Sequence, residues 1–224
     1  MGEKSQDQET IAVLAQTLGL PKRVVRCKYD EQFHLIELKL SSFERPFLPA
    51  EIGHLRHLRS LHVRHSKLRQ VPEEIGQLID LERLHLDHNH LTILPESLWQ
   101  LRNLRYLHLD HNHLTDLPSQ IGQLRELRSL ELSANCLKHL PAEIGQLRNL
   151  RNLFLSQNML STLPEELGQL PSLLILSTDG NPLTRESLNH WTSVLPTNTS
   201  ELRWTESRWE RSSDQSKLRG EGDT

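Results

Sequence analysis

Apolar residues recur along most of this chain in one fixed pattern, and each recurrence comes 23 residues after the last. When the repeats are aligned, one asparagine column contains Asn89, Asn112, Asn135, Asn158 and Asn181. The units follow L-x-x-L-x-L-x-x-N-x-L-x-x-L-P-x-x-I-G-x-L-x-x, as in LRSLELSANCLKHLPAEIGQLRN from Leu127 to Asn149. A fixed period of this length predicts stacked structural repeats, because one such unit cannot bury its leucines alone.

Each unit divides into two parts. Alternating leucines such as Leu84 and Leu86 predict a short strand with leucines inward and the intervening side chains outward. The Leu-Pro and Ile-Gly-Gln-Leu segments predict an extended, helix-poor return, in which proline fixes φ and glycine relieves crowding. The asparagine is interpreted as a buried amide that bonds to the turn backbone of its own and the adjacent unit.

The register extends toward the N-terminus in two further units. The unit from Leu58 has Ser66 in place of asparagine, and the unit from Leu35 has Phe43 there and Arg45 in place of a leucine. Terminal repeats commonly depart from a consensus because they face a cap. We therefore predict seven units of 23 residues over 35–183.

The flanking segments are predicted to cap this array. In the N-terminal cap, 1–34, a capping box at 5–8 starts a helix whose apolar face ends before Gly19, and two strand-like runs follow around a polar turn. In the C-terminal cap, 184–210, a helix is predicted from about Arg185, with Leu188, Trp191 and Leu195 on one face. Trp204 and Trp209 either extend this cap or contact a partner. The polar segment 211–224 is predicted to be disordered.

Two residues depart from their surroundings. Trp99 stands where other units have glycine, and it either offers a contact site on the convex side or lies flat across its neighbours' side chains. Cys27 is interpreted as a small buried thiol rather than a nucleophile, because Arg26 and Lys28 would point to the opposite face of a strand.

Composition narrows the function classes. Leucine occupies 46 of 224 positions, and the net charge of −3 favours neither a nucleic-acid nor a membrane-surface partner. No secretory signal or membrane-spanning run is recognisable. Cys27 and Cys136 lie far apart in the register, which favours free thiols and a cytoplasmic location. We expect a monomer without cofactors.

With five consecutive units in agreement, the chain resembles the leucine-rich repeat family, and its Leu-Pro and Ile-Gly-Gln-Leu units resemble those of intracellular Ras-associated scaffolds and plant Ras-group-related proteins. Similar arrays occur in bacteria. The resemblance implies an α/β solenoid with a parallel concave sheet, protein binding without enzymatic activity, and a small GTPase as one candidate partner. Enzymatic members carry a further kinase, GTPase or ubiquitin-ligase domain, for which the 34 residues before the array and about 40 after it are expected to leave no room.

The outward strand positions form columns on the predicted concave face. Their side chains add nothing to the leucine core, so they are free to serve recognition, and aromatic and arginine side chains commonly anchor interfaces. We predict an intracellular signalling module that binds its partner through His62, Arg64, Arg83, His85, Asp87, Tyr106, His108, Asp110, Glu131 and Phe154.

The repeated histidines allow more than one interpretation. LHLDHNHLTILP from Leu84 and LHLDHNHLTDLP from Leu107 differ at one position, so duplication of one unit would explain them without any chemistry. Alternatively, adjacent strands about 4.8 Å apart would place four metal-binding side chains on one grid: His85, Asp87, His108 and Asp110. A surface that senses pH between about 5.5 and 7.5 is the related possibility. Catalysis is not expected, since no nucleophile or oxyanion site accompanies these residues.

Overall fold

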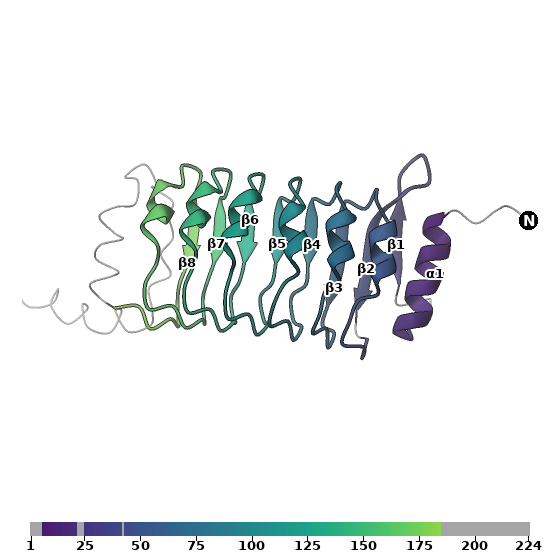
Figure 1. Ribbon diagram of the computed structural model, residues 1–224, viewed down its shortest axis with the longest axis horizontal. Coiled ribbons are helices and arrows are strands. Elements are labelled where there is room, and N and C mark those ends of the chain that lie inside the picture. Colours follow the sequence, from purple (N-terminus) through teal and green to yellow (C-terminus); the bar gives the residue numbers. More distant parts are fainter. Residues whose placement is uncertain (1–5, 22–24, 42, 185–224) are drawn as a thin grey trace, which may run out of the picture.

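The computed structural model describes residues 6–21, 25–41 and 43–184, which form the successive coils of a solenoid (Figure 1). Its strands make one sheet in chain order: β1 (Arg26–Tyr29), β2 (Leu35–Ser41), β3 (Ser60–Arg64), β4 (Arg83–His85), β5 (Tyr106–His108), β6 (Ser129–Glu131), β7 (Asn152–Phe154) and β8 (Ile175–Ser177). β1 is antiparallel to β2, and β2 to β8 are parallel. His62, His85 and His108 pair across neighbouring strands, so residues 23 positions apart in the sequence lie side by side in this part of the sheet.

The return segment of each coil lies on the side opposite the sheet (Figure 1). It contains one short 3₁₀ helix that follows a proline: η2 (Ala50–His54), η3 (Glu73–Gln77), η4 (Glu96–Gln100), η5 (Ser119–Gln123), η6 (Ala142–Gln146) and η7 (Glu165–Gln169). A Cβ on Gly145 would lie 2.8 Å from the carbonyl oxygen of Glu166 in the next coil, so glycine at this position lets these two coils approach closely. The return segments are therefore short in helix, as predicted, and packed backbone to backbone.

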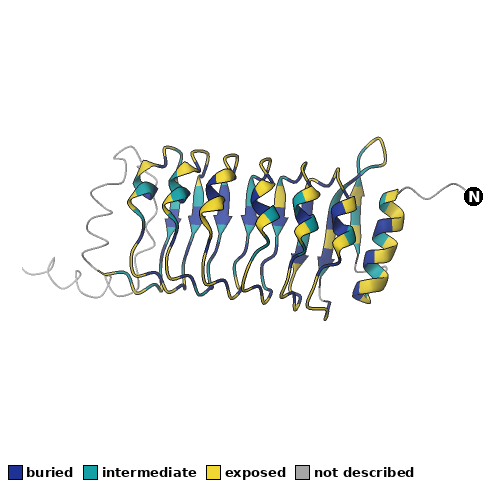
Figure 2. Ribbon diagram, in the orientation of Figure 1, coloured by how far each residue is buried: buried dark blue, intermediate teal, exposed yellow. Residues whose placement is uncertain are grey.

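The core runs unbroken along the solenoid. The inward strand leucines, including Leu84, Leu86, Leu107 and Leu109, have no exposed surface, and Figure 2 shows buried residues recurring in the strands and in the 3₁₀ helices along the solenoid. Thr178 replaces a leucine at one inward position and is also buried.

The asparagine column joins each coil to the preceding one. The Asn112 side-chain amide donates to the carbonyls of Leu86 and Leu109, both at 3.0 Å, while its Oδ1 accepts from the backbone N–H of Leu91 at 3.0 Å. Asn89, Asn135 and Asn158 make the equivalent bonds. These amides satisfy backbone groups that would otherwise be stranded in the core, which confirms their predicted structural role.

Helix α1 (Gln6–Leu18) covers the first coil with Leu14 and Leu18, which are buried, and Ile11, which is partly buried. It ends at Leu18, and the next residue, Gly19, has a φ of 67°, which glycine adopts easily. The Asp7 carboxylate accepts from the backbone N–H of Leu35 at 2.7 Å and so ties the helix to β2. Ser5 of the predicted capping box and the predicted C-terminal helix, with Trp191, Trp204 and Trp209, lie outside the described residues.

The burial of Trp99 decides between the two roles that the sequence left open for it. Its side chain is only 1% exposed, so it belongs to the core and offers no contact site on the convex side. Cys27 and Cys136 are free and half-buried, and burial raises the pKa of the Cys27 thiol, as expected of a thiol without activation. Within the described residues, none of the helices has the length and apolar character needed to cross a membrane.

Candidate functional site

The candidate site is the face of the sheet that points away from the core, which we call the concave face. Its middle column, in strand order, is Lys39, His62, His85, His108, Glu131, Phe154 and Ser177. Most of these side chains are half-buried, because neighbouring strands hold them side by side. The face therefore presents a fixed, closely spaced surface.

Two aromatic side chains, Tyr106 and Phe154, lie on this surface. The Arg83 guanidinium lies 5.9 Å from the centre of the Tyr106 ring on the neighbouring strand, within the range of a cation–π contact. Phe154 remains partly exposed on β7, two strands beyond Tyr106. Both rings combine exposed apolar surface with a rigid backbone, which suits them to anchor a partner.

Charge changes sign along the face. A hollow over β1 to β3 is lined by basic side chains, among them Arg26, Lys39 and Arg64, together with His62 and His65. Farther along, acidic side chains follow: Asp110 lies just after β5 and Glu131 lies on β6, where it is 3.2 Å from Nδ1 of His108. A partner with one acidic and one basic patch would complement this arrangement.

Three histidines form a row of adjacent rings in the middle column, with His62 and His85 stacked and His108 tilted by 46° against His85. The ring centroids of His62 and His85 are 4.2 Å apart, and those of His85 and His108 are 4.1 Å apart. Burial, followed by the charge of Lys39, lowers the pKa of His62 to about 4. Burial, followed by the charges of His108 and His62, lowers the pKa of His85 to about 3. These two rings stay neutral between pH 5.5 and 7.5, so they cannot sense pH in that range as the sequence suggested.

Asp87 also differs from its predicted role as an exposed contact. Its side chain is 1% exposed, and its Oδ2 accepts from Arg64 Nε at 2.7 Å. Arg64 is exposed above it. A partner would therefore meet Arg64, and Asp87 would act by orienting that guanidinium.

The predicted metal grid does not assemble as expected. Among the described residues, three groups bring potential ligand atoms within 4.8 Å of one another: His65, Asp87 and His88; His88, Asp110 and His111; and His108, Asp110 and Glu131. His85 belongs to none of them, because its ring is held in the stack. Asp110 belongs to two.

Sequence reasoning missed why His65, His88 and His111 reach these groups. Each has a left-handed backbone with φ between 50° and 54°, a conformation that Ala134, Gln157 and Gly180 share at the same repeat position. Side chains other than glycine pay an energetic penalty of about 1 kcal/mol or more there. Gly180 at this position is the one signal in the sequence that could have revealed the turn.

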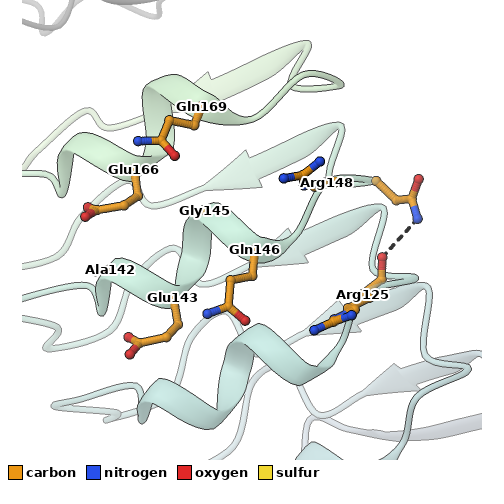
Figure 3. A pocket seen from close by; sticks show the side chains of 9 residues that line it. Arg125, Ala142, Glu143, Gly145, Gln146, Arg148, Glu166 and Gln169 are labelled. Carbon is orange, nitrogen blue, oxygen red and sulfur yellow. Dashed lines mark hydrogen bonds between the residues drawn. The ribbon is translucent and has the colours of Figure 1, made fainter.

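A second hollow lies on the convex side, between η6 and η7 (Figure 3). Arg125 and Arg148 lie on one side of it, and Glu143 and Glu166 lie on the other. Asn149 donates to the carbonyl oxygen of Arg125 at 2.9 Å, which links adjacent coils. The hollow is open and repeats the gap between successive coils, so we assign it no function.

Family models place the chain. A model described as a leucine-rich repeat region matches residues 90–217, and a leucine rich repeat model matches residues 56–114. The chain is a leucine-rich repeat protein. This membership, together with the single sheet of parallel repeat strands, confirms the predicted α/β solenoid with a helix-poor return side. No curated protein matches the chain in sequence.

Several solved structures are similar to this chain. The plant peptide hormone receptor RGFR1, in complex with RGF2, is 28% identical with a TM-score of 0.65, over 77% of this chain and 28% of that one. A plant ice-binding protein is 26% identical with a TM-score of 0.69, over 80% of this chain and 64% of that one. A third similar structure is the ectodomain of the receptor kinase GASSHO1/SCHENGEN3 from Arabidopsis thaliana, in complex with CASPARIAN STRIP INTEGRITY FACTOR 2. It is 20% identical with a TM-score of 0.51, over 71% of this chain and 29% of that one, so it shows the fold alone. This leucine-rich repeat protein thus spans less than two thirds of each.

Proposed function

We propose that this leucine-rich repeat protein is a non-enzymatic interaction module whose concave face binds a protein or peptide. The observation that carries the proposal is the row of partly exposed side chains on β4 to β7, which includes Tyr106 and Phe154. Aromatic side chains in such a position bury large areas at low entropic cost when a partner covers them. The similar plant receptor, whose structure contains RGF2, supports a peptide or protein as the class of partner.

The proposed contact surface consists of the exposed and half-buried predicted residues. Arg64 and Arg83 supply exposed positive charge toward the N-terminal strands, whereas Asp110 and Glu131 supply negative charge in the middle. We infer that a partner is oriented by this change of sign and anchored by Tyr106 and Phe154. Electrostatic pairs of this kind fix register and speed encounter more than they add affinity.

Its setting is part of the same proposal. We place the protein in the cytoplasm, as a monomer in intracellular signalling, because Cys27 and Cys136 are both free thiols. The resemblance to Ras-associated repeats makes a small GTPase one candidate partner. Titration of a purified Ras-type GTPase, loaded in turn with GDP and a GTP analogue, would test that candidate directly.

The test of the face uses a triple variant, Arg83→Ala with Tyr106→Ala and Phe154→Ala. These side chains lie outside the leucine core, so the circular dichroism spectrum should stay unchanged. Proteins captured by the wild type from an extract and then purified should bind the triple variant at least tenfold more weakly, since each lost anchor commonly costs more than about 1 kcal/mol.

The matched control alters the opposite side of the same coils, with Arg125→Ala and Arg148→Ala at the convex hollow. Its binding should equal that of the wild type. If the convex variant lost the captured partner and the triple variant kept it, the concave assignment would be wrong.

A further inference from the structure

A second row of histidines, distinct from the middle column, lies where the strands end. The ring centroids of His65 and His88 are 4.3 Å apart, and those of His88 and His111 are 4.2 Å apart. The left-handed backbone at each residue lets every ring lie near an aspartate from the column beside it. The result is a repeated juxtaposition of two imidazoles and one carboxylate, which is a common ligand set for divalent transition metals.

The spacing in these groups suits a small ion. Ligand atoms of His88, Asp110 and His111 all lie within 4.8 Å of one another. A zinc ion with bonds of about 2.0–2.2 Å draws its ligand atoms to roughly 3–3.5 Å apart. Rotation of side chains that are at least partly exposed can close this difference, and the backbone need not move.

The two groups that contain strand-end histidines differ in the charge beside their aspartate. In the group of His65, Asp87 and His88, the carboxylate is already neutralised, because Arg64 donates to Asp87 at 2.7 Å. Both aspartates have a buried Oδ1 without a hydrogen-bond partner, but among the described residues no arginine or lysine forms an ion pair with Asp110 as Arg64 does with Asp87. An uncompensated carboxylate is the stronger point of attraction for a cation.

The histidines at this position are ready to coordinate. The half-buried His88 ring lies between the rings of His65 and His111, with centroid distances of 4.3 and 4.2 Å, and one of its nitrogens lies within 4.8 Å of an Asp110 oxygen. A neutral imidazole offers the nitrogen lone pair that a metal needs. His111 is exposed, which leaves a path for the ion to enter and a side of the site open to water.

We propose that His88, Asp110 and His111 bind one divalent transition-metal ion such as Zn²⁺. The group of His108, Asp110 and Glu131 shares the same carboxylate, but His108 and Glu131 already contact each other at 3.2 Å. The ion therefore takes the strand-end histidines as its nitrogen ligands. A fourth position stays open to water or to a side chain of the bound partner, as in zinc sites with three protein ligands.

The test titrates ZnCl₂ into the untagged full-length chain at pH 7.5 by isothermal calorimetry, with elemental analysis after dialysis. The wild type should bind one equivalent. Asp110→Asn, and separately His88→Ala with His111→Ala, should weaken that binding at least tenfold. Asp179→Asn is the matched control, because it removes a carboxylate with a buried, unpartnered Oδ1 from the same column, away from the histidines, and its zinc affinity should not change.

Three outcomes would overturn the proposal. One is the absence of any binding when zinc is in tenfold excess over the wild type. Another is equal affinity in the wild type and Asp110→Asn, provided that circular dichroism shows both folded. The third is loss of zinc in His108→Ala with Glu131→Gln but not in the double variant of His88 and His111, which would assign the ion to the other group.

Discussion

The free energy of unfolding should fall steeply once the pH drops below about 6.5, because two stacked histidines cannot take up protons without leaving their packing. The ordinary histidine pKa is 6.5, whereas those of His62 and His85 are about 4 and about 3 in the folded chain. The unfolded chain therefore binds protons first. Stability is full above pH 6.5 and is lost progressively as the pH falls from 6.5 toward 4.

The size of the effect follows from the distance between the pH and the unfolded pKa. At pH 5.5, one unit below 6.5, each histidine removes about 1.4 kcal/mol from the free energy of unfolding. His62 and His85 together remove about 3 kcal/mol. That is a substantial share of the 5–15 kcal/mol roughly expected for a folded domain.

The measurement is urea denaturation followed by circular dichroism at pH 7.5 and pH 5.5, for the wild type and for His62→Gln with His85→Gln. The double variant cannot titrate at these positions, so its loss between the two pH values should be about 3 kcal/mol smaller than that of the wild type. Comparing the losses rather than the absolute stabilities removes any packing effect of glutamine. Equal losses in the two proteins would refute the reasoning, because they would mean that both rings take up protons within the folded stack.

Three further substitutions test the packing. Asn112→Ala should lower the free energy of unfolding by about 3 kcal/mol or more, because it leaves several buried backbone groups without hydrogen bonds. As a control, Asn103→Ala removes one hydrogen bond of an exposed amide, so it should lower the free energy of unfolding much less in the same urea titration. Trp99→Ala should lower the free energy of unfolding by about 3–5 kcal/mol, because the ring is buried. Ile93→Ala, at a side chain that is 70% exposed, should lower it little. Equal losses in the two variants would contradict the burial of Trp99. Gln157→Gly should raise the free energy of unfolding by about 1 kcal/mol, and with it the melting temperature, because it relieves the left-handed strain at a φ of 57°. A lower melting temperature would show that this strain does not destabilise the turn.

The repeat architecture could be predicted from the sequence because one period controls every level of the structure. Leu84 and Leu107 occupy the same place in the pattern and pair across neighbouring strands. The same period predicted the outward columns, since residues in register must lie side by side. Asn112 could be assigned a buried role for the same reason, as a polar residue in an otherwise apolar position needs partners in the core.

The environment of individual side chains could not be predicted in this way. Periodicity placed Asp87 on the outward face, but it could not show that Arg64 and the neighbouring strands would bury it. It placed Trp99 at a glycine position without revealing that the coil would enclose the ring. The left-handed turn at His88 depends on backbone geometry that histidine does not favour, so the pattern pointed to His85 as a metal ligand instead.

The direction of the sheet's hydrogen bonds governs how the protein would respond to a mechanical load. The bonds between β2 and β8 run from coil to coil, along the long axis of the solenoid, so tension between the ends of the array would act on the successive interfaces in series, and they would give way one at a time. Each coil that detaches would release 23 residues, or about 75–80 Å of extended chain. The protein would therefore lengthen under force in steps of nearly equal size, one coil at a time.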